Sequence, residues 1–170
     1  MSNGEDRLKQ RKTHVRWSRL NHDLPGGLHR PKRKGDIGWD LECMEDVEIP
    51  PMGRVDVPVN ARLWLPDGFY ADIRNRSSMS KRNLYVDQNL LDTGYRGPIY
   101  VLIRNLTLPQ MHSWDGSHYW DFESGTVTLK AGERIAQLVF HTHHPVWEDE
   151  VHEVPLDTER AEAGFGSTGR

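Results

Sequence analysis

Residues 89–105 of the chain are NLLDTGYRGPIYVLIRN. The stretch places one carboxylate, Asp92, and one phenol ring, Tyr95, on a turn punctuated by glycine, and the turn leads directly into PIYVLIRN at 98–105. Runs rich in β-branched and aromatic residues that are bounded by turn residues indicate strands. The aspartate is therefore either a structural turn residue or a catalytic base, and the rest of the chain has to supply the partners that decide between these roles.

The same strand pattern recurs along the chain, with Gly, Pro, Asn and Asp between the segments. Many short strands with frequent turn signals are typical of an all-β sandwich or barrel. The single helical candidate is SMSKRN at 78–83, where Ser77 or Ser78 could cap the first turn. We therefore predict an all-β fold with strands at 14–20, 39–43, 46–50, 54–60, 62–66, 69–74, 83–87, 99–106, 126–130, 134–141 and 147–154.

The composition indicates one domain between two tails. Only 36% of the 170 residues are hydrophobic and the mean hydropathy is −0.73, which is typical of a small core supplemented by burial between subunits, or of a partly disordered chain. Six tryptophans favour the first interpretation. We predict a flexible basic tail at 1–12, a β-barrel domain at 13–156 and a mobile, glycine-rich arm at 157–170.

The distribution of charge and the cysteine content limit the kinds of partner and the cellular compartment that we expect for this chain. Residues 1–34 hold ten Lys/Arg against three acids, but sparse aromatic residues and a pI of about 6.3 favour a solvated tail over a nucleic-acid contact. The lone Cys43 excludes an internal disulfide and suits a buried structural thiol in a reducing compartment. Without a membrane-length apolar run or a signal-like N-terminus, we expect a cytoplasmic protein and no membrane partner.

Polar and basic residues stand beside glycines or at strand ends in four further segments. Each has a structural alternative when taken alone, such as a helix cap for Ser77, a satisfied strand amide for Gln137 or a surface charge for Arg160. With Asp92 and Tyr95 they form a set of phosphate-binding groups with one acid and one flat ring, which suits a polyphosphate that carries a base. The candidates are Asp40, Arg76, Ser77, Ser78, Gln137, Arg160, Ser167 and Thr168.

The order of these segments resembles that of the homotrimeric dUTPases, the dUTP pyrophosphatases. Five motifs occur in the family's order and span most of the chain. They are IGWDL at 37–41, RSS at 76–78, NLLDTGYRG at 89–97, GERIAQL at 132–138 and RAEAGFGSTG at 160–169.

The resemblance implies a distorted β-barrel of jelly-roll type, a homotrimer with exchange of the C-terminal arm, and active sites that combine three subunits. It also implies hydrolysis of dUTP to dUMP and pyrophosphate with Mg2+ as the cofactor. Because the triphosphate itself ligates Mg2+, the protein needs no cage of ligands for the metal. The His141/His143 pair of HTHH alternates along the end of a strand, so we interpret it as structural and not as a metal site.

The resemblance also implies a role for each matching residue. Asp92 matches the aspartate that activates the attacking water, and Tyr95 matches the ring that packs against the deoxyribose. Asp40 matches the acid that reaches the magnesium through a water molecule. The other matches are substrate contacts: Arg76, Ser77, Ser78 and Gln137 on the phosphates, Asn89 and Leu91 in the uracil hairpin, and Arg160, Phe165, Gly166, Ser167 and Thr168 in the arm, where Phe165 would stack on uracil.

The chain differs from the motif sequences of the family at several positions. Asn89 stands where glycine is usual, and a turn that needs a positive φ tolerates asparagine best after glycine. Gly94 replaces a second acid, which leaves Asp92 as the one carboxylate of the motif. The remaining departures are Ile37 and Trp39 in the first motif and Ala161 and Ala163 in the arm.

Two other functions stay open. DTGY also resembles the DPGW of the related dCTP deaminases, but Leu102 stands where their catalytic glutamate is expected, and an aliphatic side chain cannot transfer protons; hydrolysis of dCTP as well as dUTP is not excluded. Residues 107–125 form an insertion with Trp114, Tyr119, Trp120 and Phe122, similar in placement to the extra segment of some phage dUTPases. It could bind a protein partner in a virus-encoded, nucleotide-responsive protein, although we favour a hairpin packed on its own barrel.

Overall fold

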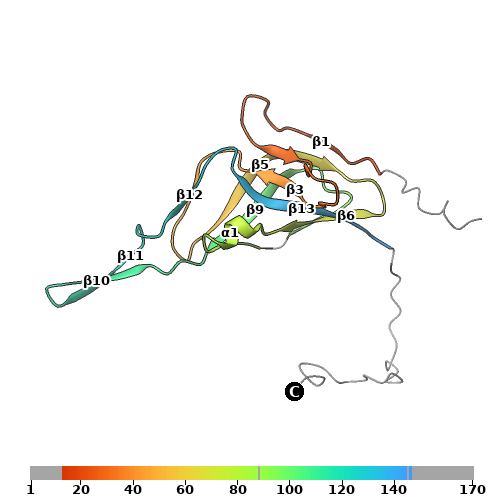
Figure 1. The fold of residues 1–170 in the computed structure, drawn as a ribbon. Coiled ribbons are helices and arrows are strands. Elements are labelled where there is room, and N and C mark those ends of the chain that lie inside the picture. Colours follow the sequence, from red (N-terminus) through yellow and green to blue (C-terminus); the bar gives the residue numbers. More distant parts are fainter. Residues whose placement is uncertain (1–12, 88, 145, 147–170) are drawn as a thin grey trace, which may run out of the picture.

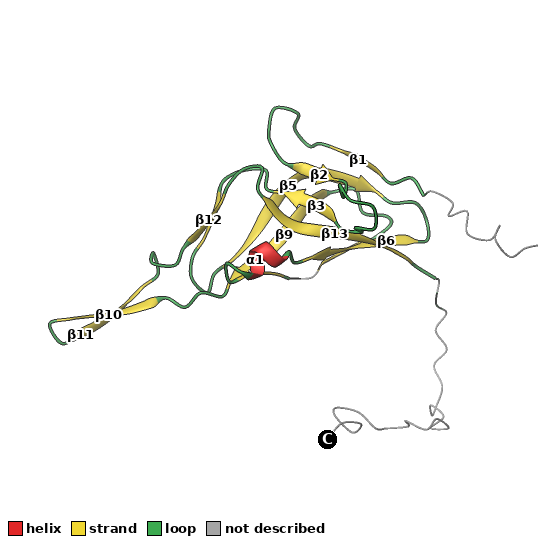
Figure 2. Ribbon diagram, in the orientation of Figure 1, coloured by secondary structure: helices red, strands yellow, loops and turns green. Residues whose placement is uncertain are grey.

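The computed structural model describes residues 13–87, 89–144 and 146, and the regular structure of these residues consists of strands apart from one short helix (Figures 1 and 2). The predicted tail at 1–12, the predicted strand at 147–154 and the predicted arm at 157–170 lie outside the described residues. The elements in chain order are β1 (Arg16–Ser18), β2 (Gly27–His29), β3 (Trp39–Glu42), β4 (Val47–Ile49), β5 (Arg54–Trp64), β6 (Phe69–Arg74), α1 (Ser77–Ser80), β7 (Leu84–Val86), β8 (Asn89–Leu91), β9 (Pro98–Asn105), β10 (Gln110–Trp114), β11 (Ser117–Asp121), β12 (Val127–Leu129) and β13 (Arg134–Thr142).

Two larger sheets enclose the core. One has the strand order β1-β5-β9-β7 and the other the order β2-β3-β13-β6-β8, while β12-β4 and β10-β11 form two-stranded sheets. Apolar side chains of both larger sheets belong to one buried cluster, to which β5 and β9 contribute Val57 and Val101 and the second sheet contributes Leu41, Ile73 and Leu138. This sandwich confirms the prediction of an all-β, jelly-roll-like fold.

Strand β13 lies at the centre of the five-stranded sheet and joins its two halves. It pairs with β3 on one side and with β6 on the other, both antiparallel. Ile135, Ala136 and Leu138 are buried in β13. Since successive side chains of a strand point to opposite faces, the polar residues of β13 and its neighbours line the outer face of the sheet.

Strand β5 corrects one prediction, because the segments expected as separate strands at 54–60 and 62–66 form a single strand of 11 residues. The register against β9 shifts between Val59 and Arg62, so a bulge absorbs the irregularity without ending the strand. Asn60, which marked the expected break, is fully buried.

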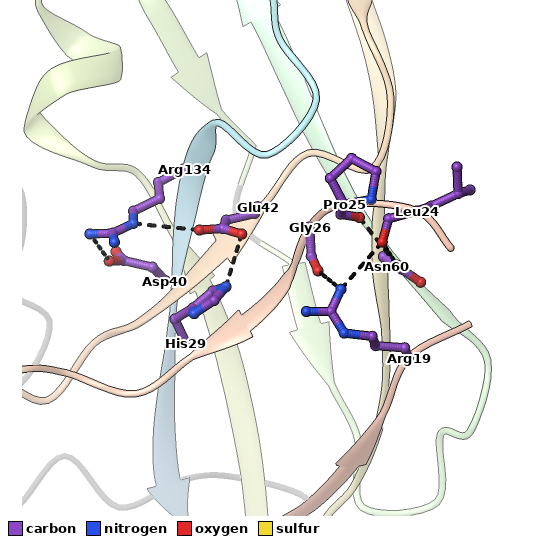
Figure 3. Close-up of polar contacts among 9 residues, drawn as sticks. All are labelled: Arg19, Leu24, Pro25, Gly26, His29, Asp40, Glu42, Asn60 and Arg134. Atoms are coloured by element: carbon purple, nitrogen blue, oxygen red, sulfur yellow. Dashed lines mark hydrogen bonds and ion pairs between the residues drawn. The ribbon is translucent and has the colours of Figure 1, made fainter. Parts of the chain in front are cut away.

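The Asn60 side chain holds the segment that precedes β2 (Figure 3). Its Oδ1 accepts hydrogen bonds from the backbone N–H groups of Leu20 and Asn21, both at 2.9 Å. Its Nδ2 donates to the carbonyl oxygens of Asn21, Leu24 and Pro25 at 2.7, 2.9 and 3.1 Å. The amide thus satisfies the irregular backbone through which the chain enters the five-stranded sheet.

The helix start differs from the prediction, since neither Ser77 nor Ser78 caps α1. The N-cap is Arg76, and its side chain forms no capping hydrogen bond. The helix has four residues and is anchored by the buried Met79. The Arg76 guanidinium points instead toward the neighbouring sheet, as described below.

Cys43 has the predicted structural role. It is fully buried, and burial raises the pKa of its thiol to about 11. The neutral thiol therefore persists at physiological pH, where a reactive cysteine would need to ionise.

The predicted insertion forms a projecting hairpin. Strands β10 and β11 extend away from the two larger sheets (Figure 1), and Trp114 and Trp120 are 78% and 58% exposed. The expectation that this hairpin packs on its own barrel is therefore wrong. Its strands stabilise each other through their own pairing, in which the His112 and Tyr119 rings stack at 5.5 Å.

Among the described residues, the one helix is far too short and too polar to cross a membrane.

We expect Asn60→Ala to lower the free energy of unfolding by about 3 kcal/mol, because it leaves buried N–H and C=O groups without partners. Chemical denaturation measures this loss. Gln110→Ala, which removes an exposed amide from β10, is the control and should cost less than about 0.5 kcal/mol. Equal stability of the two variants would show that the Asn60 contacts do not hold the segment.

Candidate functional site

A row of polar side chains crosses the outer face of the five-stranded sheet. His29 lies opposite Asp40 on β3, and Gln137 of β13 lies opposite both Asp40 and Arg74. Residues that face each other in neighbouring strands point to the same side of a sheet. The pairing therefore brings Asp40 and Gln137, which are far apart in the sequence, onto one polar surface.

Two arginines hold the Asp40 carboxylate. Arg76 Nε lies 3.2 Å from Oδ1, and Arg134 Nη1 lies 3.2 Å from Oδ2. Arg76 also donates from Nη1 to the Arg134 carbonyl oxygen at 2.8 Å. This contact attaches the start of α1 to β13, so that the predicted phosphate-binding residue and the predicted metal-contacting acid are direct neighbours.

The ion pairs continue to strand β2 (Figure 3). Arg134 Nε lies 3.6 Å from Glu42 Oε1, and His29 Nε2 lies 2.8 Å from Glu42 Oε2. Sequence reasoning missed Arg134, His29 and Glu42. Arg134 stands inside the GERIAQL motif, so the motif itself carried a signal, whereas the contribution of His29 depends on strand pairing that no local pattern reveals.

A hollow of about 550 Å³, here called the Asp40 pocket, opens beside this network. Asp40, Arg76, Arg134 and Gln137 line it together with residues of the loop between β2 and β3. Gly38 packs closely against this network, because a Cβ there would lie 3.0 Å from the Gln137 side-chain amide and would have to displace it. The pocket has the cationic and amide groups that bind phosphates.

The exposed Asp92 follows strand β8 at a tight turn. The Tyr95 N–H donates to the Asp92 carbonyl oxygen at 3.1 Å, and the Tyr95 hydroxyl donates to the Pro98 carbonyl oxygen at 2.7 Å. Thr93 Oγ1 donates to the Phe69 carbonyl oxygen at 2.5 Å. These bonds fix the turn to the sheet and leave the Asp92 carboxylate at the surface.

A smaller hollow of about 190 Å³, the Asp92 pocket, lies along this hairpin and is lined by Asn89, Leu90, Leu91, Asp92, Tyr95, Pro98 and Tyr100. Leu91 is only 7% exposed, so little of this residue is open to solvent. Asn89 begins β8 opposite Ile73, which corrects the expectation that it occupies a turn.

The predicted site residues thus fall into two groups. The Asp40 pocket and the Asp92 pocket share no lining residue. Ser77 and Ser78 are exposed on α1 and line neither pocket. Arg160, Phe165, Gly166, Ser167 and Thr168 lie outside the described residues.

His141 has structural contacts of its own. Its ring stacks on Tyr70 with centroids 5.0 Å apart, and its Nε2 lies 3.2 Å from Asp72 Oδ2. The two atoms form no hydrogen bond, so the attraction is that of an ion pair when the ring is protonated. In the described part of the chain, no three His, Cys, Asp or Glu residues are grouped as a metal would require.

An all-β sandwich with a cationic pocket and a separate hairpin carrying an exposed acid beside a phenol ring is suited to a phosphorylated molecule with a flat ring. Comparison with known families gives the class: the family pattern described as dUTPase matches residues 26–112 and 118–169, and the chain belongs to this family. The interruption at 113–117 falls at the tip of the β10–β11 hairpin, so only the tip, and not the whole segment 107–125, lies outside the family pattern.

Curated relatives cover most of the chain. The deoxyuridine 5'-triphosphate nucleotidohydrolase of Cutibacterium acnes is 35% identical over 149 residues, which are 86% of this chain and 88% of the relative. The enzyme of the same name from Thermobifida fusca is 38% identical over 158 residues, 91% of this chain and 78% of the relative.

Solved structures of phage dUTPases share the fold. The Staphylococcus bacteriophage 80alpha dUTPase with dUPNHPP aligns with a TM-score of 0.80 at 23% identity and covers 94% of this chain and 100% of its own. A point variant of the dUTPase from phage phi11 of S. aureus, described with a structural Mg(II) ion, has a TM-score of 0.70 at 20% identity over 83% of this chain and 98% of its own.

Gly97→Ala should loosen the Asp92 turn, because a Cβ at this position would overlap the Tyr95 ring. We expect faster amide hydrogen exchange of Tyr95, by about tenfold or more, as its bond to the Asp92 carbonyl opens. Gly94→Ala is the matched control, since a Cβ there meets nothing within 4 Å. Equal exchange in both variants would contradict the packing of Tyr95 on Gly97.

Proposed function

We propose that this chain hydrolyses dUTP to dUMP and pyrophosphate. The observation that carries the proposal is the exposed Asp92 carboxylate on a hairpin that also presents the Tyr95 ring, in a chain that belongs to the dUTPase family. The relatives named deoxyuridine 5'-triphosphate nucleotidohydrolase support the same reaction. The product dUMP would then be available to nucleotide metabolism.

Asp92 is the proposed general base. Its carboxylate accepts a proton from water, the water oxygen forms a bond to the α-phosphorus, and the bond from that phosphorus to the leaving oxygen of pyrophosphate breaks. A base must lie within hydrogen-bond reach of the water and keep its orientation. The hydrogen bonds of Thr93 and Tyr95 supply that orientation by fixing the turn on either side of the carboxylate.

The Asp40 pocket is the proposed site of the phosphates. Phosphoryl transfer depends mainly on positioning and on neutralising charge. Arg76 and Gln137 supply a guanidinium and an amide from two elements that their mutual contacts hold rigidly, while Ser77 and Ser78 add hydroxyls at the exposed start of α1.

The Asp92 pocket is the proposed site of the deoxyuridine. Strand β8 is at the edge of its sheet, so the backbone groups on its outer side have no strand partner among the described residues and can bind the edge of a pyrimidine. Asn89 and Leu91 contribute through this backbone. The half-exposed Tyr95 ring provides a flat surface for the sugar, where a 2′-hydroxyl would be excluded sterically.

The residues fit Mg2+ that arrives with the triphosphate. The pocket offers Asp40 as a carboxylate whose two oxygens are already paired with arginines, which suits contact through a water molecule and not direct capture of a bare ion. When bound, Mg2+ supplies neutralisation of the phosphate charge. Asp40 would orient its water shell.

A homotrimer is proposed because the two pockets share no residue within one chain. A complete site then combines the Asp40 pocket of one subunit with the Asp92 pocket of another across the β8 edge. The arm residues Arg160, Phe165, Gly166, Ser167 and Thr168 remain proposed contacts to the phosphates and the base, and the domain limits at 13 and 156 remain proposals.

Deamination is the less favoured chemistry. Leu102 is on the same outward face of β9 as Tyr100, opposite Asp56, so the position expected for a deaminase glutamate holds an aliphatic side chain. Hydrolysis of dCTP remains an alternative substrate choice. One methyl group in a pocket changes the binding free energy by about 1–3 kcal/mol, so discrimination against dTTP would be strong but incomplete.

Asp92→Asn should lower kcat for dUTP by about 10²–10⁴-fold with a small change in KM, because the amide cannot accept the proton. Pyrophosphate release with Mg2+ from dUTP, dCTP, dTTP and UTP measures this. Asp115→Asn, at the tip of the projecting hairpin, is the control and should retain full activity. If native protein releases pyrophosphate from none of the four nucleotides, the proposed function is wrong.

The β10–β11 hairpin supports a second function, binding of a protein partner. Its exposed aromatic residues form a surface that contributes nothing to the core, and aromatic residues are enriched where proteins bind each other. The two functions are compatible in one protein, because no residue of the β10–β11 hairpin lines either pocket.

Replacing 110–123 with a short Gly-Ser linker should leave kcat/KM for dUTP within about twofold and abolish partner binding, because the hairpin adds no core residue. Steady-state kinetics and co-purification of an identified partner are the readouts. Trp114→Ala/Trp120→Ala in the intact hairpin separates the loss of aromatic surface from the loss of the segment. A large loss of activity on replacement would contradict the independence of the hairpin.

A further inference from the structure

The loop between β2 and β3 adds basic residues to the Asp40 pocket. Arg30, Lys32 and Arg33 line the pocket together with Arg76 and Arg134. Of the thirteen lining residues, five are Lys or Arg and two are Asp, although the whole chain has a net charge of −3. Positive charge is therefore concentrated in this hollow.

The cations of the pocket differ in how they are paired. Arg76 and Arg134 are engaged with Asp40, and Arg134 also with Glu42. Lys32 and Arg33 are exposed, and neither forms an ion pair with another described residue. The positive charge of Arg76 and Arg134 is thus partly offset by carboxylates, whereas Lys32 and Arg33 add positive charge that no described carboxylate offsets.

A tight turn follows the basic residues of the loop. The Asp36 N–H donates to the Arg33 carbonyl oxygen at 3.3 Å. Gly35 has a φ of +98°, a conformation that residues other than glycine rarely adopt. A Cβ on Gly35 would meet nothing within 4 Å, so the glycine serves the turn and not a close contact. Arg30 is held over the Trp39 ring at 5.2 Å.

We propose that Lys32 and Arg33 form an anion subsite that binds the distal phosphates of a nucleoside triphosphate and the pyrophosphate released from it. The proposal rests on the proposed function for the identity of the nucleotide, but the subsite itself binds pyrophosphate alone. Exposed cations attract a polyanion through charge-assisted hydrogen bonds that weaken as salt increases.

The test is the affinity of the full-length protein for pyrophosphate, measured by isothermal titration calorimetry at low and high NaCl. We expect Lys32→Ala/Arg33→Ala to bind pyrophosphate about tenfold more weakly, with a shallower salt dependence. Lys34→Ala/Lys81→Ala is the matched control, because it removes two exposed cations, one from the same loop, that form no ion pair with another described residue and do not line the pocket. Its affinity should change less than about twofold.

Three results would overturn the subsite: no binding of pyrophosphate by the native protein, equal losses in the two double variants, or full affinity in Lys32→Glu, where reversed charge should weaken binding further. Thermal unfolding of each variant shows whether it is folded. A single-stranded 12-nucleotide DNA that binds through Lys32 and Arg33 and is not displaced by pyrophosphate would also overturn it, since the loop would then serve nucleic acid.

Measuring dUTP hydrolysis beside pyrophosphate binding distinguishes failure of the subsite from failure of the proposed function. If the native protein hydrolyses dUTP, Lys32→Ala/Arg33→Ala should raise KM about tenfold with kcat nearly unchanged, because the loop binds phosphates without touching the reacting water. If the native protein hydrolyses no nucleotide but binds pyrophosphate through Lys32 and Arg33, the subsite stands and the proposed function falls.

Discussion

The antiparallel pairing of β13 with β3 and β6 is the constraint on which the rest of the structure depends. It places Gln137 opposite both Asp40 and Arg74, so one register aligns polar groups from three strands on the outer face. The same register turns Leu138 and its neighbours into the core. A slip of one residue would exchange the two faces, so the stability of the core and the geometry of the Asp40 pocket are set by the same hydrogen bonds.

The charged residues of the Asp40 pocket fall into two groups. Arg76 and Arg134 neutralise Asp40 and fix α1 to the sheet, which makes them a rigid base for the pocket. The loop cations remain free of partners among the described residues and can respond to a ligand. The Asp92 pocket shares no lining residue with the Asp40 pocket and lies along β8, an edge strand of its sheet.

The sequence predicted most of the strands, because period-two alternation is a local property of runs such as PIYVLIRN. It also predicted Asp92, Tyr95, Asp40 and Arg76 as candidates, because their motifs are short and ordered. Pairing between distant strands was not predictable, and this is why His29 was missed. The continuity of β5 through Asn60 was not predictable either, because the hydrogen-bond partners of this buried side chain lie some forty positions away in the sequence. The projection of β10–β11 was missed because a hairpin rich in aromatic residues can either pack on the core or expose these residues at the surface.

The central claim is that one catalytic site combines the Asp40 pocket of one subunit with the Asp92 pocket of another. Subunit mixing tests it directly: Asp92→Asn and Arg76→Ala, each inactive alone, are unfolded together, refolded as mixed oligomers and assayed for pyrophosphate release from dUTP. In random trimers about a quarter of the sites would receive an intact half from each variant, so activity should return to about that fraction of the native value. If both halves belong to the same chain, every site retains one defect, and the absence of any recovery in verified mixed oligomers would contradict the account.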